Sequence, residues 1–346
     1  MLVGYPTRKE WLSNYNEVNT RKVLDASLKQ FDSFLTGLEK KELEFFEYVR
    51  NTDEMELFRI IDKLKNQLTS KLSPTSAKYY LGHLMTWWRA NGISIDQLKL
   101  KSNIRWNKVH KEIKYTPDRE EIQKIIDNSY TLQYKLFYHF AIATGARQFE
   151  ILSLRKMDVD LNNEIPSVHF LAENTKTKQE RYSFLTPECT DLLKKYYLSE
   201  DLDPKDKIFP MTLSTLQVHF QRIRIRLGRS EKYSTGTSKL SIHRLRAYTK
   251  RQLSRNAGDD FSHLILGHAE GLGTYDGDNI ESLRVDYTKA VTDLTIGVHS
   301  RTKQKEKDQD EEIKLLHQDI ELLKMKIEHT THTSPSPPHT EDTKLI

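Results

Sequence analysis

The spacing of apolar residues in the first hundred positions constrains the fold most. Between residues 19 and 100 these residues recur every three or four positions, which is typical of helices with one buried face and not of half-buried strands. The clearest run is Leu57, Phe58, Ile61, Leu64 and Leu68. Ser73 and Pro74 open another helix, which stops at Asn91-Gly92. The sequence therefore predicts that this half of the chain is entirely helical, with Trp87 and Trp88 in its core.

A second structural unit is predicted to begin near residue 116. Thr116 can cap a helix, and the acidic residues that follow suit the positive end of the helix dipole. After a helix ending near Leu154, residues 167–171 and 181–185 give the clear β signal, around a polar turn. Thr186-Pro187 then opens a further helix. We expect a mainly α fold with a small β-sheet, divided into two domains.

Basic residues gather where the two predicted domains meet. Residues 99–119 contain only two acidic residues against seven basic ones: Lys99, Lys101, Arg105, Lys108, Lys111, Lys114 and Arg119. Such a stretch can follow a phosphate backbone, and the net charge of +5 agrees with a polyanionic partner. Taken alone, the stretch fits a solvated basic linker equally well.

Composition excludes several classes of protein. With Cys189 as the single cysteine, neither a disulfide framework nor a cysteine-ligated zinc site can form. No stretch approaches the roughly 18 apolar residues of a membrane span, and the first residues do not resemble a signal peptide. We therefore expect an intracellular protein without metal, cofactor or membrane contact.

Three segments carry residues suited to phosphate chemistry. Breaking a DNA phosphodiester without a metal requires cations for the phosphate, a nucleophile and an acid for the leaving oxygen. Residues 144–147 end an apolar helix at a glycine turn and supply Arg147, whose forked guanidinium can bind two phosphate oxygens. His243 and Arg246 are spaced to share one face of a helix, and His268 follows a glycine. Alone, each is more often an ion pair, a cap or a core residue.

In this order, the segments resemble the motifs of the tyrosine recombinases of the phage-integrase type. Residues 144–147 resemble the first arginine box, residues 241–246 the His-x-x-Arg box, and residues 264–268 the Leu-Gly-His box. Ala247 stands where the family often has a second histidine.

The polar turn of residues 175–181 resembles the one that carries the family's lysine. Aligning it through Glu180-Arg181 assigns that lysine to Lys176, with Lys178 as the alternative.

The family's nucleophile is a tyrosine, for which this chain has two candidates. Neither has the usual spacing from the Leu-Gly-His histidine. We expect Tyr287, because residues 280–290 have the pattern of a helix and residues 286–296 resemble the tyrosine helix of archaeal-type integrases. Tyr275, which lies between Gly273 and Gly277, is the alternative.

The resemblance implies a site-specific recombinase or integrase that cleaves and rejoins double-stranded DNA through a 3′-phosphotyrosyl intermediate. Arg147 and Arg246 would hold the phosphate, and Lys176 would protonate the leaving oxygen. His243 and His268 would donate to phosphate oxygens, or His243 would take the proton of the nucleophile. A homo-oligomer is also implied, a dimer on one site and a tetramer in synapsis, acting on DNA in the cytoplasm. The alternatives are a type IB topoisomerase and a DNA-binding relative without catalysis.

The resemblance also divides the chain. It implies a helical core-binding domain at residues 1–108, a basic linker at 109–115 and a catalytic domain at 116–300, which clamp DNA from opposite sides. Residues 301–329 are not covered; their apolar residues alternate by three and four, as in a short coiled coil or a helix packed on its own body. Residues 330–346 are expected to be disordered.

Overall fold

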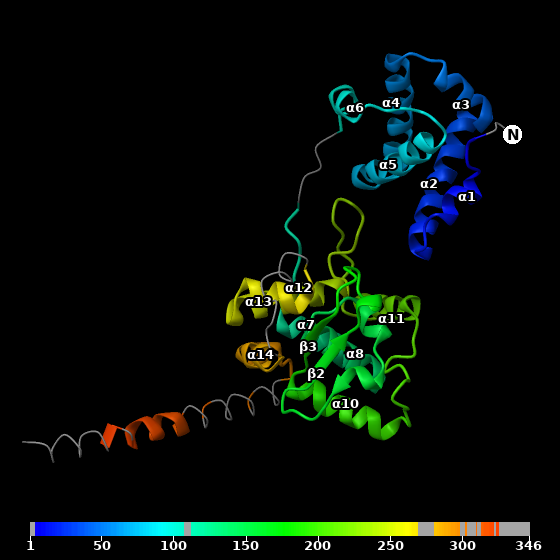
Figure 1. Ribbon diagram of the computed structural model, residues 1–346. Coiled ribbons are helices and arrows are strands. Elements are labelled where there is room, and N and C mark those ends of the chain that lie inside the picture. The colour runs from blue at the N-terminus through cyan, green and yellow to red at the C-terminus, as the bar shows by residue number, and fades with distance from the viewer. Residues whose placement is uncertain are drawn as a thin grey trace, which may run out of the picture. The chain divides into compact units, whose positions relative to one another are not determined.

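A computed structural model describes residues 4–106, 112–268, 280–297 and 313–321, together with 302, 309, 323 and 324. Helices predominate, and the described residues contain one small antiparallel sheet (Figure 1). The predicted mainly α fold with a small β-sheet is confirmed. Part of the basic linker, Tyr275 and the expected disordered end lie outside the described residues. The chain divides into two compact units, residues 1–113 and 114–346.

Within the described residues of the first unit, every regular element is a helix, as the apolar spacing predicts. Its helices are α1 (Arg8–Ser13), α2 (Val18–Gly37), α3 (Glu42–Arg50), α4 (Glu54–Lys71), α5 (Pro74–Ala90) and α6 (Gln97–Asn103). The side chain of Ser73 accepts a hydrogen bond from the Ser76 amide at the start of α5, where Pro74 occupies the first turn. The rings of Phe45 and Trp88 lie 5.1 Å apart in a core that also buries Trp87. The two tryptophans are therefore core residues, as expected.

The second unit wraps helices around the sheet. Its helices are α7 (Arg119–Asp127), α8 (Leu132–Thr144), α9 (Gln148–Ser153), α10 (Pro187–Ser199), α11 (Leu213–Arg226), α12 (His243–Ala257), α13 (Asp259–Leu266) and α14 (Ile280–Leu294). Its strands are β1 (Val159–Asp160), β2 (Ser167–Phe170) and β3 (Arg181–Phe184), paired antiparallel in that order. The cap of α7 is Asp118, which accepts from the Glu121 amide, so the prediction of Thr116 as cap was wrong by two residues.

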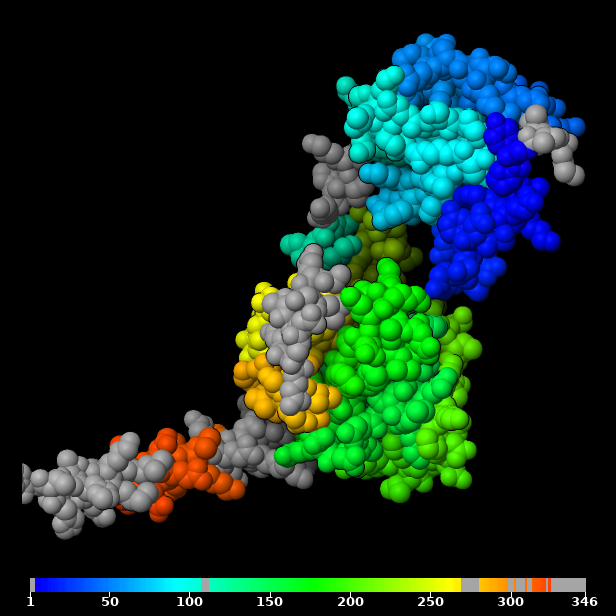
Figure 2. All heavy atoms as spheres, in the orientation of Figure 1, coloured from blue at the N-terminus to red at the C-terminus, as the bar shows by residue number. Residues whose placement is uncertain are grey.

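Helix α8 is the centre of this unit. Every residue from Leu136 to Thr144 is buried, because α8 packs against both α10 and α12. Helices α12, α13 and α14, yellow to orange, lie together on one side of the unit beside the green elements (Figures 1 and 2). The carboxyl end of α8 therefore faces the layer that contains the histidine motifs.

Residues 313–321 are helical, and the side chains of Ile313, Leu316 and Ile320 are about half exposed there. None of the helices within the described part of the chain combines the length and the apolar character that a membrane span needs.

Candidate active site

A tight turn after α8 delivers Arg147. The helix closes at Gly145, whose φ of 59° lies in the left-handed region that favours glycine. A β-carbon at Gly145 would lie 2.4 Å from Cδ2 of Leu266 and 3.0 Å from Cγ2 of Thr249. The position therefore needs glycine for its conformation and for its close approach to α12 and α13. Arg147 follows as the N-cap residue of α9.

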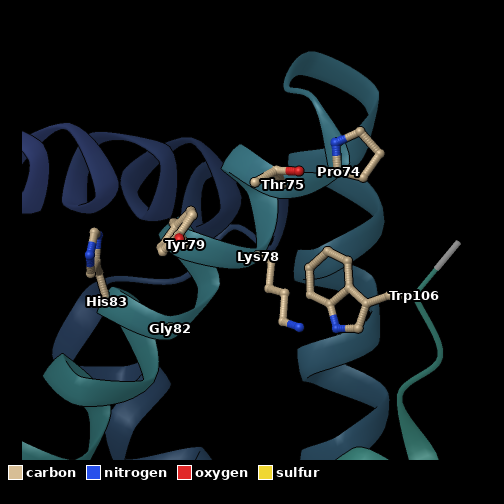
Figure 3. A pocket seen from close by; sticks show the side chains of 7 residues that line it. All are labelled: Pro74, Thr75, Lys78, Tyr79, Gly82, His83 and Trp106. Atoms are coloured by element: carbon tan, nitrogen blue, oxygen red, sulfur yellow. The ribbon is translucent and has the colours of Figure 1, made fainter. Parts of the chain in front are cut away.

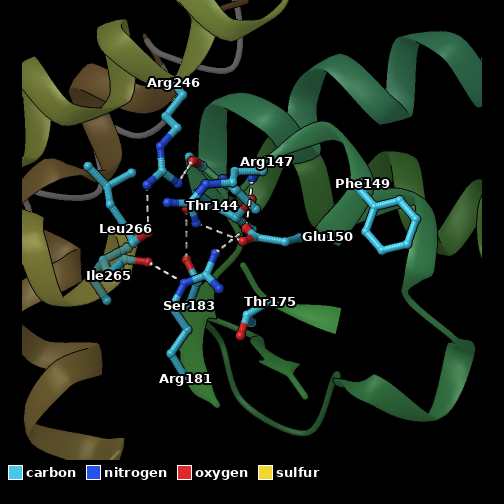
Figure 4. Close-up of polar contacts among 12 residues, drawn as sticks. Thr144, Arg147, Phe149, Glu150, Thr175, Arg181, Ser183, Arg246, Ile265 and Leu266 are labelled. Carbon is cyan, nitrogen blue, oxygen red and sulfur yellow. Dashed lines mark hydrogen bonds and ion pairs between the residues drawn. The ribbon is translucent and has the colours of Figure 1, made fainter. Parts of the chain in front are cut away.

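Glu150 holds Arg147 in place. Its Oε2 accepts from the Arg147 amide at 2.8 Å, and its Oε1 accepts from an Arg147 guanidinium nitrogen at 2.8 Å. Glu150 is buried, and Arg181 on β3 donates to the same Oε2 at 2.8 Å (Figure 4). Burial alone would raise the pKa of Glu150, but the charges of Arg181 and Arg147 and the hydrogen bonds of Arg147 keep it below its usual value. Glu150 is therefore a carboxylate at neutral pH.

Arg246 joins the cluster from α12. It is 6% exposed, and its guanidinium donates to the carbonyls of Gly145 at 2.6 Å and Leu266 at 2.7 Å (Figure 4). Burial, and then the charge of Arg147, lower its pKa to about 10, so it stays protonated at neutral pH. The guanidinium groups of Arg147 and Arg246 are held near each other although their charges repel, which favours the binding of an anion beside them.

Two histidines complete the cluster. His243 begins α12, and His268 follows Gly267, which ends α13 in the left-handed conformation. Burial first and then the charge of Arg246 lower the pKa of both, that of His268 to about 4. The charge of Arg147 also acts on both imidazoles. Both are therefore neutral at neutral pH in the free protein and can donate to, or accept from, an incoming group.

Lys176 lies on a pre-formed turn beside β3. The Thr175 hydroxyl accepts from the Gln179 amide at 3.1 Å and donates to a backbone carbonyl, which closes the turn. Lys178 has a φ of 56°, in the left-handed region, while Lys176 is exposed. The structure thus brings four of the six predicted residues together and leaves Lys176 exposed on the turn.

Tyr287, the predicted nucleophile, lies inside the core of the second unit. Tyr287 is 0% exposed, and its hydroxyl donates to the Ala143 carbonyl at 2.9 Å. Leu283, Val291 and Leu294, on the same face of α14, are also buried, so the whole face belongs to the core. Burial raises its pKa far above the ordinary value for tyrosine. In this position the hydroxyl is shielded from the surface of the unit. Tyr275 lies outside the described residues.

A polar groove of about 600 Å³ lies beside the cluster. It runs along α11 and the loop before α12, and its lining includes Gln148, Gln217, Gln221, Arg224, Thr237, Ser241 and Arg244. Two lining atoms, Oε1 of Gln148 and Nε of Arg244, are buried and have no hydrogen-bond partner among the described residues. Atoms of this kind favour an occupant that offers hydrogen-bonding groups.

The first unit has a surface pocket of about 570 Å³ beside α5. Lys78, Tyr79, His83 and Trp106 line it, together with Pro74, Thr75 and Gly82 (Figure 3). A cation and aromatic rings side by side can contact both phosphates and bases.

A metal centre is not evident in the part of the chain that the structure describes. No group of three or more histidine, cysteine, aspartate or glutamate side chains there could hold an ion.

The sequence missed the pair of Glu150 and Arg181. Glu150 could have been predicted, because an acidic residue three positions after the N-cap can bond the backbone at the start of a helix. Arg181 gave no such signal, because its partners lie 31 and 84 residues away in the chain.

The chain is similar to known DNA recombinases. Residues 117–274 match the model of the Phage integrase family. Tyrosine recombinase XerA of Saccharolobus solfataricus is 31% identical over 186 residues, 53% of this chain but only 58% of the length of XerA. Tyrosine recombinase XerC of Staphylococcus epidermidis is 25% identical over 293 residues, 80% of this chain and 92% of XerC.

The fold is similar to that of a solved recombinase. The XerH site-specific recombinase bound to its difH substrate, in a pre-cleavage complex, has 19% sequence identity and a TM-score of 0.54. The similarity covers 78% of each chain.

Proposed function

We propose that this chain is a tyrosine recombinase of the phage integrase family, which cleaves and rejoins double-stranded DNA at specific sites through a 3′-phosphotyrosyl intermediate. The cluster of Arg147, Arg246, His243 and His268 is the observation that carries the proposal. It combines two fixed cations with two neutral imidazoles at one place. Such a set binds a phosphodiester and stabilises the charge that develops when a nucleophile adds to it.

Each of these residues has a distinct task in the proposal. The guanidinium groups of Arg147 and Arg246 bind the non-bridging oxygens of the scissile phosphate, because N–H groups not used by Glu150, Gly145 and Leu266 remain to donate. His268 donates to a phosphate oxygen, and His243 donates to one or takes the proton of the nucleophile.

The turn residue Lys176 protonates the leaving 5′ oxygen. Its exposure on a hairpin turn lets it approach DNA from the edge of the site, and the closed turn limits the positions that it can occupy. The new phosphotyrosyl bond then keeps the energy of the cleaved bond, so that a free 5′ hydroxyl can attack it and restore the DNA chain.

We assign the nucleophile to Tyr275. Of the two tyrosines that the sequence offers, Tyr287 is held inside the core by its hydrogen bond to Ala143 and by the packing of α14. The assignment to Tyr275 therefore rests on elimination.

Double-stranded DNA is the proposed partner, in a dimer on one site and a tetramer in synapsis. The polar groove along α11 offers glutamine and arginine side chains, which can pair with the edges of adenine and guanine. The surface around Lys78 and Trp106 gives the first unit its own contact with the duplex. The helical first unit thus corresponds to the core-binding domain, and the second unit to the catalytic domain.

A metal-free trapping experiment tests the proposal. The protein is mixed in EDTA with duplexes of randomised sequence that carry a nick, so that a cleaved strand diffuses away and leaves a covalent adduct. We expect an adduct on a subset of sequences, identified by sequencing the attached DNA. Arg147→Ala and Arg246→Ala should each lower the single-turnover rate by about 100-fold. Failure to form an adduct with any sequence, or wild-type rates in both variants, would reject the proposal.

A further inference from the structure

We propose that Arg181 is a positioning residue. By forming an ion pair with Glu150, it sets the orientation of Arg147 and leaves Arg147 able to bind a phosphate. The inference rests on the proposed function, because it concerns the arginine that binds the phosphate there. Arg181 itself is buried, with 3% of its side chain exposed, so it does not touch DNA.

The contacts of Arg181 connect three motifs. Its Nε donates to the Ile265 carbonyl at 3.0 Å, and a terminal nitrogen donates to Oε2 of Glu150 at 2.8 Å (Figure 4). The guanidinium also lies over the ring of Phe170, at 4.3 Å from the ring centre. One side chain on β3 therefore fixes the start of α9 against the end of α13.

The end of α13 is held by two arginines. The Ile265 carbonyl accepts from Arg181, and the next carbonyl, of Leu266, accepts from Arg246. Carbonyls in the last turn of a helix lack partners within the helix and carry partial negative charge, so both bonds are favourable. The position of Arg181 is thus coupled to the position of Arg246 as well as to Glu150.

Arg181 also controls how strongly Glu150 holds Arg147. Glu150 uses Oε1 for the Arg147 guanidinium and Oε2 for Arg181 and the Arg147 amide. Burial lowers the pKa of Arg181, but the charge and hydrogen bond of Glu150 counteract that effect, so the two buried charges depend on each other. Without Arg181, the full charge of Glu150 would act on Arg147 and compete with the phosphate for it.

Arginine is required because the two acceptors lie in different directions. Its planar fork donates through Nε to one acceptor and through a terminal nitrogen to another, and it lies over the ring of Phe170. A lysine at this position keeps the charge but presents only a single ammonium. Arg181→Lys should therefore preserve the fold better than Arg181→Met and still disturb the orientation of Glu150.

The test is a double-mutant cycle on single-turnover cleavage, using the full chain and a nicked duplex that traps the wild type. Arg181→Met should lower the cleavage rate by roughly 10- to 100-fold and leave DNA affinity within about threefold of wild type. Adding Glu150→Gln should recover part of the rate, because it removes the uncompensated charge. Arg181→Lys should fall between wild type and Arg181→Met, and it carries the test if Arg181→Met does not fold.

A matched control separates positioning from stability. Leu193 on α10 is 0% exposed, so Leu193→Ala should lower the melting temperature without changing the cleavage rate of the folded protein. The proposal is overturned if Arg181→Met cleaves as fast as Leu193→Ala, if both Arg181 variants lose affinity as much as rate, or if Glu150→Gln lowers the rate further instead of recovering it.

The design distinguishes this inference from the proposed function. If the wild type forms no adduct with DNA, the proposed function fails. The coupling of Glu150 and Arg181 is still measured by the thermal unfolding of the wild type, the two single variants and the double variant without DNA. Additive losses of stability in that cycle would overturn the inference independently.

Discussion

At the scale of single residues, the site depends on where each charge is held. Arg147 and Arg246 are fixed by acceptors on the protein, whereas His243 and His268 are neutral because burial and the nearby cations disfavour their charged forms. An incoming phosphate would relieve this excess of positive charge. The free protein is thus prepared for an anion.

Tyr287→Phe should leave cleavage unchanged. The substitution removes the hydrogen bond to the Ala143 carbonyl inside the core and should lower the free energy of unfolding by about 1 kcal/mol. Tyr275→Phe should abolish the covalent adduct and keep DNA binding. Urea unfolding and a trapping assay on both variants measure the two effects, and loss of the adduct in Tyr287→Phe alone would reverse the assignment.

The free energy of unfolding of the free protein should decrease as the pH is lowered from 6.5 to 4. The pKa of His268 is lowered to about 4 in the folded protein, so within this range the unfolded chain binds a proton that the folded chain does not. Stability therefore decreases as the pH falls. His268→Asn should reduce this dependence, measured as the free energy of unfolding at pH 7 and pH 5. An equal pH dependence in both proteins would contradict the assignment of the effect to His268.

At the scale of elements, the site forms because three short segments meet around the end of α8. A β-carbon at Gly145 would lie only 2.4 Å from Cδ2 of Leu266, and one at Gly267 would lie 2.9 Å from Cδ of Arg181. These glycines make the close approach possible. The turn and the helix ends therefore have to form together.

Gly145→Ala should lower the free energy of unfolding by about 1–3 kcal/mol, because alanine is strained at positive φ and would also collide with α12 and α13. Cleavage should fall as well, since the turn carries Arg147. Gly37→Ala is the control: Gly37 lies in α2, and a β-carbon there would meet no atom within 4 Å. That variant should be unchanged or slightly more stable. Equal stability of the two variants in thermal unfolding would refute the role of the turn.

How much the sequence could predict depended on the range of the interaction. Strand β3 and the helix after it follow from local pattern, and Thr186 does cap α10 as expected by accepting from the Cys189 amide. His243 and Arg246 both lie in the first turn of α12, as their local spacing predicted, whereas their proposed roles came from the resemblance to the His-x-x-Arg box. The burial of Tyr287 could have been predicted from the sequence, since Leu283, Val291 and Leu294 form an apolar face with it. The Glu150–Arg181 pair was not available, because it depends on tertiary packing.

At the scale of the whole molecule, each of the two units has its own core and its own polar surface. The core of the first unit is rich in aromatic residues, whereas that of the second surrounds α8. If both surfaces contact one DNA duplex, as proposed, each contact raises the effective affinity of the other.

Truncation after Ser300 should weaken assembly but preserve cleavage. The predicted phosphate contacts lie before that residue, whereas Ile313, Leu316 and Ile320 are at least 49% exposed and can contribute an apolar seam to another helix. So short a seam is weak alone and should act mainly when DNA brings protomers together. Sedimentation with and without DNA, together with a strand-transfer assay, measures the effect. Loss of single-site cleavage would instead show that the tail supports the active site.

We propose that the arginine and histidine cluster binds the DNA phosphate that Tyr275 attacks. Mapping the covalent adduct by protease digestion and mass spectrometry tests this most directly. The prediction is a single modified peptide, with the nucleotide on Tyr275, formed by wild type in EDTA and lost in Arg147→Ala. DNA attached to Tyr287, or an adduct that forms equally well in Arg147→Ala, would contradict the account.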